Sequence, residues 1–126
     1  MRLLLDSHLL IWLLYEPDRI PSHVVNEIGS AAAVSLSVAS LWELALKHSK
    51  GKLAYPPAEL AEGRGALNLT ELPVLSDHVL ALHDVKLPHA DPFDRILVAQ
   101  AQVEQAVLVT ADANLLASGY ATLPAI

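Results

Sequence analysis

The residues of this sequence that could do chemistry are four separated carboxylates, Asp6, Glu43, Asp94 and Asp112. A group of carboxylates suits hard cations such as Mg²⁺ and Mn²⁺, which prefer oxygen ligands. The sequence has no cysteine, so thiolate metal sites and disulfide frameworks are excluded. If the four acids converge, they indicate metal-assisted hydrolysis of a phosphodiester, in which the ion activates water and stabilises charge on the phosphate.

Asp6 and Asp112 both follow apolar runs of strand length, a position where a carboxylate often caps the next helix or turn. Asp6, or Ser7 after it, could cap the helix that the following residues predict. Asp112 could cap the turn that begins at Ala113. For both acids the sequence leaves a capping role and a role in a metal site open.

Glu43 and Asp94 lie within predicted helices, where local roles are also available. Glu43 precedes Lys47 by four residues, which is the spacing of a weak, solvated salt bridge in a helix. Asp94 lies three residues after Asp91, the predicted N-cap, and an acid in the first helical turn interacts favourably with the helix dipole. Taken singly, none of the four acids identifies an active site.

The elements that position these acids alternate between short apolar runs and longer stretches of helical periodicity. This alternation predicts a three-layer α/β fold with a mostly parallel sheet covered on both faces. The length of 126 residues fits a single domain, 1–126. The predicted strands are Arg2–Leu5, Ala33–Leu36, Leu69–Leu72, Ala106–Val109 and a weaker one near Leu123. The predicted helices are Ser7–Tyr15, Pro21–Ser30 with Pro21 in its first turn, Ser37 to about Gly51, Pro56–Gly65, Ser76–Leu82 and Asp91–Glu104.

This topology brings the four acids to one edge of the sheet. In a parallel sheet every strand ends at the same edge, where the following helix begins and where ligands bind. Asp6 ends the first strand and Asp112 follows the fourth, while Glu43 and Asp94 lie in early turns of helices that begin at this edge. Because clustered carboxylates repel one another unless a cation neutralises them, their convergence predicts a bound divalent ion.

Composition limits the classes of protein that the sequence can represent. Apolar residues make up 53% of the chain, which argues against disorder and suggests that a partner covers some apolar surface. The formal charge of −6 is unusual for a nucleic-acid-binding protein, but cations held by the acids would present positive charge. No apolar run is long enough to span a bilayer, so we expect no membrane partner. The absence of cysteine fits the reducing cytoplasm, where we expect the protein.

Four segments of the sequence resemble, in order, the acidic motifs of PIN-domain VapC toxins: LLLDSHLLIWLL, SVASLWELALK, HADPFDRILVAQA and LVTADANL. They extend from Leu3 to Leu116. The resemblance implies a PIN-like three-layer α/β/α sandwich with a central, mostly parallel sheet of four to five strands. It also implies an endoribonuclease that depends on Mg²⁺ or Mn²⁺, acts as the toxin of a type II toxin–antitoxin system, and is neutralised by a VapB-like antitoxin. Proteins of this family often form dimers, so we expect a homodimer.

The resemblance also assigns roles to residues. Asp6, Glu43, Asp94 and Asp112 match the first to fourth motif acids, and are therefore expected to be the catalytic residues and metal ligands. The match selects Asp94 rather than Asp91 because Asp94 begins the run DRILVAQA. Asp91 either supports the site or, as we prefer, caps its own helix.

Several neighbouring residues have two interpretations each. Thr110 and Ser37, beside motif acids, could orient a metal-bound water, although hydrogen bonds in turns and caps are the commoner role of such hydroxyls. His8 and His89 flank the predicted site but lack the spacing of metal ligands. Arg95, in the third motif, could contact a substrate phosphate or form an ordinary salt bridge.

Other features could contact partners. A cluster of basic residues at the far end of the helix that carries Glu43 either guides RNA or is a solvated helix end. Trp12 and Trp42 are expected in the core or an interface rather than stacked on bases, and the Pro56–Gly65 segment is a candidate antitoxin or dimer contact. The basic cluster consists of Lys47, His48, Lys50 and Lys52.

Two other functions fit the same residues. One is a Mg²⁺-dependent phosphatase or DNA nuclease of the same fold, and the other is a non-catalytic metal-binding module that acts by protein contact. Activity on RNA, DNA and phosphomonoesters would separate them.

Overall fold

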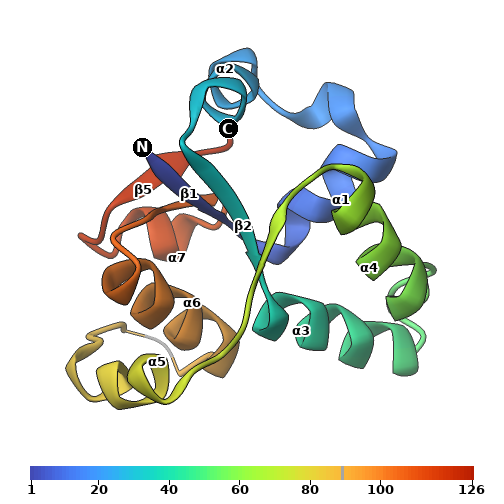
Figure 1. Ribbon diagram of the computed structural model, residues 1–126. Helices are drawn as coiled ribbons and strands as arrows, with labels where there is room; N and C mark the ends of the chain where they lie inside the picture. The colour runs from blue at the N-terminus through green and yellow to red at the C-terminus, as the bar shows by residue number, and fades with distance from the viewer. Residues whose placement is uncertain (89) are drawn as a thin grey trace.

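A computed structural model describes residues 1–88 and 90–126, which are built around one parallel sheet (Figure 1). The strand order is β3-β2-β1-β4-β5, and every neighbouring pair is parallel. This arrangement confirms the predicted α/β sandwich with a mostly parallel sheet. The strands are β1 (Arg2–Leu5), β2 (Ala33–Ser37), β3 (Thr70–Leu72), β4 (Val107–Thr110) and β5 (Thr122–Pro124).

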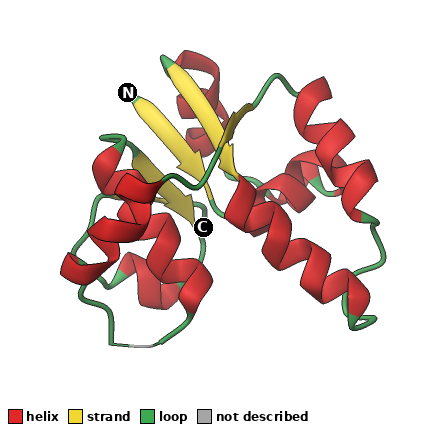
Figure 2. Cartoon of the chain, turned by 60° about the horizontal axis from the view of Figure 1, so that its bottom comes forward, coloured by secondary structure: helices red, strands yellow, loops and turns green. Residues whose placement is uncertain are grey.

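Helices cover both faces of the sheet, as Figure 2 shows. One face packs against α1 (Ser7–Tyr15), α2 (Ser22–Ser30), α3 (Val38–Ser49) and α4 (Pro57–Ala66). The other packs against α6 (Pro92–Val103) and α7 (Ala113–Leu116), with α5 (Ser76–Ala81) lying against α6. Two short 3-10 helices complete the elements, η1 (Pro17–Arg19) and η2 (Leu82–Asp84). No helix in the described part of the chain is long and apolar enough to cross a membrane.

The run RLLL forms a strand because both sides of β1 are buried. Leu3 and Leu5 pack among the α1–α4 side chains, while Leu4 packs with Leu97 and Leu108 on the opposite face. A central parallel strand covered on both faces is expected to be continuously apolar rather than alternating. The lone polar residue at its end, Asp6, is thereby placed at the carboxyl edge of the sheet.

The strand order also locates a point where the chain changes direction across the sheet. From β1 the chain moves outward through β2 to β3, then returns to pair β4 with the other side of β1 and continues to β5. Open parallel sheets bind ligands at such a switch point, in the crevice at the carboxyl ends of the strands. Here the switch point is the β1–β4 pair, which carries Asp6 and, two residues beyond β4, Asp112.

Differences from the predicted elements are small. Pro21 lies at the N-cap of α2 with an extended backbone rather than in its first turn, and α3 ends at Ser49 before Gly51, whose φ of 74° stops the helix. The predicted strand near Leu123 is present as β5. The short helices η1, η2 and α7 are additional, since three or four residues carry too little periodicity to be recognised.

Candidate active site

Asp6 is the most buried of the four predicted acids, with 6% of its surface exposed. Its backbone N–H donates to Val109 O at 2.9 Å, which continues the β1–β4 pairing by one residue. Although Asp6 occupies the N-cap position of α1, its side chain makes no capping hydrogen bond. Its carboxylate instead accepts hydrogen bonds from two hydroxyls, Thr110 Oγ1 at 2.7 Å and Ser7 Oγ at 3.2 Å. The capping role considered for Asp6 is therefore not the one its side chain performs.

Ser7 connects Asp6 to Glu43. The fully buried Ser7 hydroxyl lies 2.9 Å from Glu43 Oε1 and 3.2 Å from Asp6 Oδ1, so the two carboxylates flank a single proton donor. The other oxygen of Glu43 lies 3.5 Å from Lys47 Nζ, which confirms the predicted helical salt bridge. Glu43 thus has both its local partner, Lys47, and a connection to Asp6 through Ser7. From the sequence, Ser7 was expected only as a possible helix cap.

Thr110 connects Asp6 to Asp112 in the same way. While donating to Asp6, its buried hydroxyl accepts the Asp112 backbone N–H at 3.0 Å. Asp112 Oδ1 accepts from the backbone of Asn114 at 2.8 Å and of Leu115 at 3.2 Å, which confirms that Asp112 caps the turn that follows. Asp112 therefore lies near Asp6 with one carboxylate oxygen engaged in capping α7.

Asp94 occupies the first turn of α6, at the same edge. Asp91 Oδ1 accepts from the backbone of Phe93 at 2.9 Å and of Asp94 at 3.3 Å, which confirms that Asp91 caps its own helix. The starts of α3 and α6 are held together by an edge-to-face contact between Trp42 and Phe93, whose ring centroids are 5.1 Å apart. Trp42 and Phe93 immediately precede Glu43 and Asp94 in the sequence. Their contact therefore places the helices that carry these two acids side by side.

The hydroxyls thus group Asp6 with Glu43 and with Asp112, while packing brings Asp94 to the same edge. Among residues 1–88 and 90–126, however, no group of three or more His, Cys, Asp or Glu is arranged to hold a metal ion. Mg²⁺ commonly takes only one or two protein carboxylates and keeps waters or substrate phosphates as its other ligands. Asp6 and Glu43 provide two carboxylates of this kind, whose oxygens are suitable ligands for Mg²⁺.

A hollow of about 270 Å³ opens beside Asp6 at the switch point. Asp6 and Asp112 supply its acidic wall, and the predicted flanking residue His8 also lines it. The other predicted flanking residue, His89, lies outside the described residues. The remaining lining residues of the hollow are Trp12, Arg19 and Ala111. Arg19 was not recognisable as a site residue from the sequence, because its place beside Asp6 depends on the path of the chain after α1.

The other candidate residues have mostly structural roles. Ser37 accepts from Ala39 N at 3.0 Å and caps α3, as preferred from the sequence. Arg95 donates to Leu82 O at 3.4 Å, and His48 Nδ1 lies 2.8 Å from Leu53 O. Trp12 is buried, as expected, whereas Trp42 is 61% exposed and thus lies on the surface rather than in the core.

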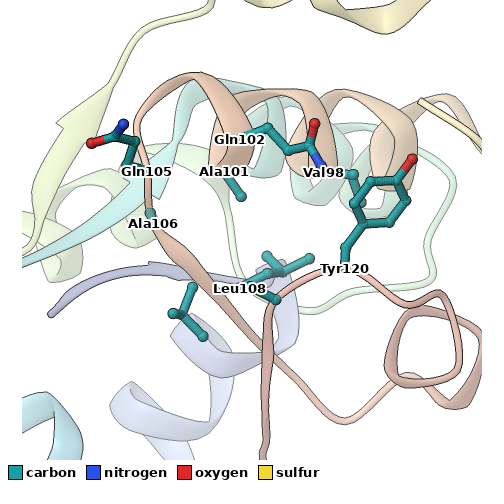
Figure 3. Close-up of a pocket in the computed structure, with 9 residues that line it drawn as sticks. Val98, Ala101, Gln102, Gln105, Ala106, Leu108 and Tyr120 are labelled. Atoms are coloured by element: carbon teal, nitrogen blue, oxygen red, sulfur yellow. The ribbon is translucent and has the colours of Figure 1, made fainter. Parts of the chain in front are cut away.

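A larger hollow, of about 420 Å³, lies between α6, β4 and the segment that precedes β5, away from the acids (Figure 3). Within the described part of the chain, its lining contains apolar side chains, two glutamine amides and the Tyr120 ring, but no carboxylate. It includes Val107, at the start of β4 and hence at the edge opposite Asp112. This hollow therefore does not offer the chemistry indicated by the four acids.

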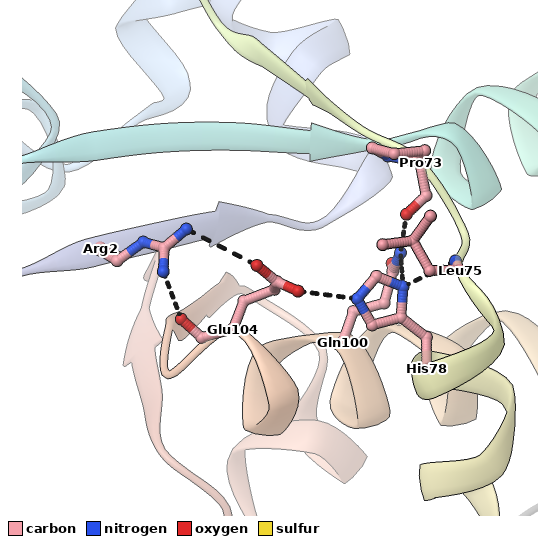
Figure 4. Close-up of polar contacts among 6 residues, drawn as sticks. All are labelled: Arg2, Pro73, Leu75, His78, Gln100 and Glu104. Carbon is pink, nitrogen blue, oxygen red and sulfur yellow. Dashed lines mark hydrogen bonds and ion pairs between the residues drawn. The ribbon is translucent and has the colours of Figure 1, made fainter.

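A second polar network, built around a buried histidine, joins α5 to α6 (Figure 4). His78 is fully buried, with Nδ1 accepting from Leu75 N at 3.0 Å and Nε2 lying 2.9 Å from Glu104 Oε2. Gln100 Nε2 donates to Pro73 O at 3.2 Å, and Arg2 donates to Glu104 O at 2.8 Å. Both ring nitrogens of His78 are engaged within the protein, so this network holds elements together and offers no open site.

The PIN domain family model matches residues 3–118 of this chain. Solved structures with a similar fold include VapBC2 from Rickettsia felis bound to a promoter DNA fragment, with a TM-score of 0.71, 16% identity, and coverage of 98% of this chain and 97% of that one. A toxin–antitoxin complex from Klebsiella pneumoniae has a TM-score of 0.68, 16% identity, and coverage of 98% and 97%. FitAcB from Neisseria gonorrhoeae has a TM-score of 0.62, 20% identity, and coverage of 96% of both chains. Among curated proteins, no sequence matches this chain.

Proposed function

The chain belongs to the PIN domain family, and on that premise we propose that it is a Mg²⁺- or Mn²⁺-dependent endoribonuclease that acts as the toxin of a toxin–antitoxin pair. The observation that carries this proposal is the placement of Asp6. It is buried at the β1–β4 switch point, and the hydroxyls of Ser7 and Thr110 connect it to Glu43 and to Asp112. Buried acids at this place in a parallel sheet are expected to serve a ligand rather than the fold.

The protein's part in the reaction would be to hold oxygen donors in place around the ion and the phosphate. Asp6, Glu43, Asp94 and Asp112 are the residues proposed to hold the ion, directly or through water. When bound, the ion would supply an activated water and stabilise charge on the scissile phosphate and the leaving oxygen. The hydroxyls of Ser7 and Thr110 restrict the orientation of Asp6, so that its oxygens are preorganised before substrate arrives.

An antitoxin is the proposed protein partner. The structures similar in fold from Rickettsia felis and Klebsiella pneumoniae are a VapBC complex and a toxin–antitoxin complex. At 16% identity they support the fold of this chain, and the ordered acidic motifs support extending the partnership to it. We expect that a VapB-like antitoxin binds this chain and suppresses its activity.

A second copy of the chain is the other proposed partner. Exposed apolar side chains gather around the starts of α3 and α6 and along α5, and we name this surface the apolar face. It combines projecting side chains, such as Leu80 at 73% exposure, with an apolar hollow of about 330 Å³. A twofold interface needs projections and hollows on the same surface. The apolar face comprises Val38, Trp42, Val74, Leu75, Val79 and Leu80 around the hollow that Phe93 and Ile96 line.

Expression in bacteria tests the proposed activity. Induction of the wild-type chain without an antitoxin should arrest growth and produce discrete new RNA ends, whereas Asp6→Asn, expressed to the same level, should do neither. Growth arrest that persists with Asp6→Asn would contradict the proposed mechanism. Purified protein assayed on DNA and phosphomonoesters separates a nuclease of RNA from a phosphatase or DNA nuclease of the same fold.

A further inference from the structure

We propose that Arg19, held on the ring of Trp12, forms a phosphate-binding subsite for the RNA backbone beside the acidic site. This inference rests on the proposed function, because it assigns the substrate contact of the same site. Arg19 and Trp12 line the hollow that also contains Asp6 and Asp112. A phosphate held there would lie next to the acids.

The position of Arg19 is fixed by the turn that follows α1. Glu16 N donates to Trp12 O at 2.9 Å, and Arg19 N donates to Glu16 O at 3.0 Å, so the chain folds back over the last turns of the helix. The Arg19 guanidinium carbon lies 4.6 Å from the Trp12 ring centroid. Because Trp12 is only 9% exposed and packed in the core, its ring is a rigid support for the cation.

The charges around the hollow indicate that Arg19 serves to bind an anion. The hollow contains two carboxylates, and the whole chain has a formal charge of −6, so a phosphate approaching it meets repulsion. Arg19 is the lining residue that carries a permanent positive charge. It therefore offers attraction in a hollow where the two carboxylates would otherwise repel the RNA backbone.

The existing partner of Arg19 leaves the guanidinium able to bind a phosphate. Its ion pair with Glu16 is 3.4 Å long, and the two side chains are 58% and 52% exposed. Exposed pairs of this kind contribute little free energy and exchange readily. A guanidinium also presents a planar fork of donors that matches two phosphate oxygens, which an ammonium group does not.

Arg19 is thus a positioning residue, and its loss should weaken RNA binding more than the chemical step. The test uses labelled single-stranded RNA and Mg²⁺ with the non-cleaving Asp6→Asn protein, and measures affinity by fluorescence anisotropy at several salt concentrations. Adding Arg19→Gln should weaken binding by roughly 3- to 10-fold and reduce the slope of log affinity against log salt by about 0.7, the value for one phosphate contact on a single strand.

Two further variants serve as controls. Arg2→Gln removes the same charge at the opposite end of β1 and should leave the salt slope unchanged. Arg19→Lys keeps the positive charge but loses the planar fork of donors, so it should keep the salt slope and lose only part of the RNA affinity. It also provides the test if Arg19→Gln does not fold. Unchanged affinity and slope in folded Arg19→Gln, or an equal change in Arg2→Gln, would overturn the subsite.

Cleavage by the protein with Asp6 intact separates this inference from the proposed function. If the wild-type protein cleaves RNA, Arg19→Gln should raise KM by the same factor as the dissociation constant while kcat changes less than about twofold. RNA binding that depends on Arg19 without any cleavage would support the subsite and contradict the nuclease. A wild-type protein that binds no RNA would overturn both.

Discussion

At the scale of single residues, Asp6 and Asp112 show how similar sequence contexts lead to different roles. Both follow a strand and precede a helix, yet only Asp112 caps the helix after it. The difference comes from Thr110 and Ser7, whose buried hydroxyls engage the carboxylate of Asp6. The sequence predicted both acids at the correct edge. Thr110 could not be recognised as a partner of Asp6, because the contact depends on the pairing of β1 with β4, which joins residues about a hundred positions apart in the chain.

The first prediction compares the effects of replacing Asp91 and Asp94, which lie at the start of α6. Asp91→Asn should retain stability and RNA cleavage, because asparagine caps a helix about as well as aspartate. Asp94→Asn should lower kcat at least about 100-fold, the order of loss expected when a group that stabilises the transition state is removed. Both are measured by RNA cleavage and thermal unfolding. Equal losses of activity in the two folded variants would show that the motif match selected the wrong aspartate.

The second prediction concerns the hydroxyl between Asp6 and Glu43. Ser7→Ala removes the donor that both carboxylates flank, so kcat should fall about 10-fold and the Mg²⁺ concentration for half-maximal rate should rise. Ser37→Ala is the matched control, since it removes a buried serine that caps α3. The control should lose about 1 kcal/mol of unfolding free energy with little change in kcat. A Ser7→Ala enzyme with wild-type kcat and metal dependence would count against this role.

At the scale of elements, the central strands were predictable because burial on both faces makes them continuously apolar. The predicted Arg2–Leu5 and Ser7–Tyr15 segments coincide with β1 and α1. Contacts between elements were not predictable, and the packing of α4 on α1 is one of them. Tyr15 donates to Glu59, and burial together with this hydrogen bond raises the pKa of Tyr15 to about 12. Tyr15 also stacks on Tyr55, with ring centroids 3.6 Å apart.

The third prediction uses two glycines of α4 to measure this packing. A Cβ at Gly63 would lie 2.6 Å from Leu14 Cδ1, whereas a Cβ at Gly65 would meet nothing within 4 Å. Gly65→Ala should therefore gain up to about 1 kcal/mol of unfolding free energy from helix propensity. Gly63→Ala should be less stable than Gly65→Ala by about 1–2 kcal/mol, because Leu14 must shift. Chemical denaturation measures both, and equal gains would contradict the close approach of α4 to α1.

At the scale of the whole molecule, the order of acidic motifs predicted more than composition did. The net charge argued against a nucleic-acid partner, whereas the α/β alternation and the four acids predicted a site at the carboxyl edge of the sheet. The strand order of the structure places Asp6 and Asp112 together at that edge. Arg19 was not foreseen, because its approach to Trp12 depends on the turn after α1. The apolar face was also hidden, since its residues come from three separate segments.

The fourth prediction tests that face as a contact between two copies. Leu80→Glu places a charge on the apolar face and should convert a dimer to a monomer, because burying an unpaired carboxylate is costly. Val25→Glu makes the same kind of change at an exposed position on α2 and should leave the dimer intact. Light scattering after size exclusion measures both. A wild-type chain that is monomeric at high concentration would show that the face is not a dimer interface.

The central claim is that Asp6 belongs to a metal-dependent ribonuclease site, and cleavage of total bacterial RNA by purified protein tests it most directly. Wild-type and Asp6→Asn proteins, matched in melting temperature, are compared in Mg²⁺, in Mn²⁺ and in EDTA. We predict discrete fragments from the wild-type protein with either metal, and none in EDTA or from Asp6→Asn. Equal cleavage by both proteins, or no cleavage by folded, metal-supplied wild type, would contradict the account.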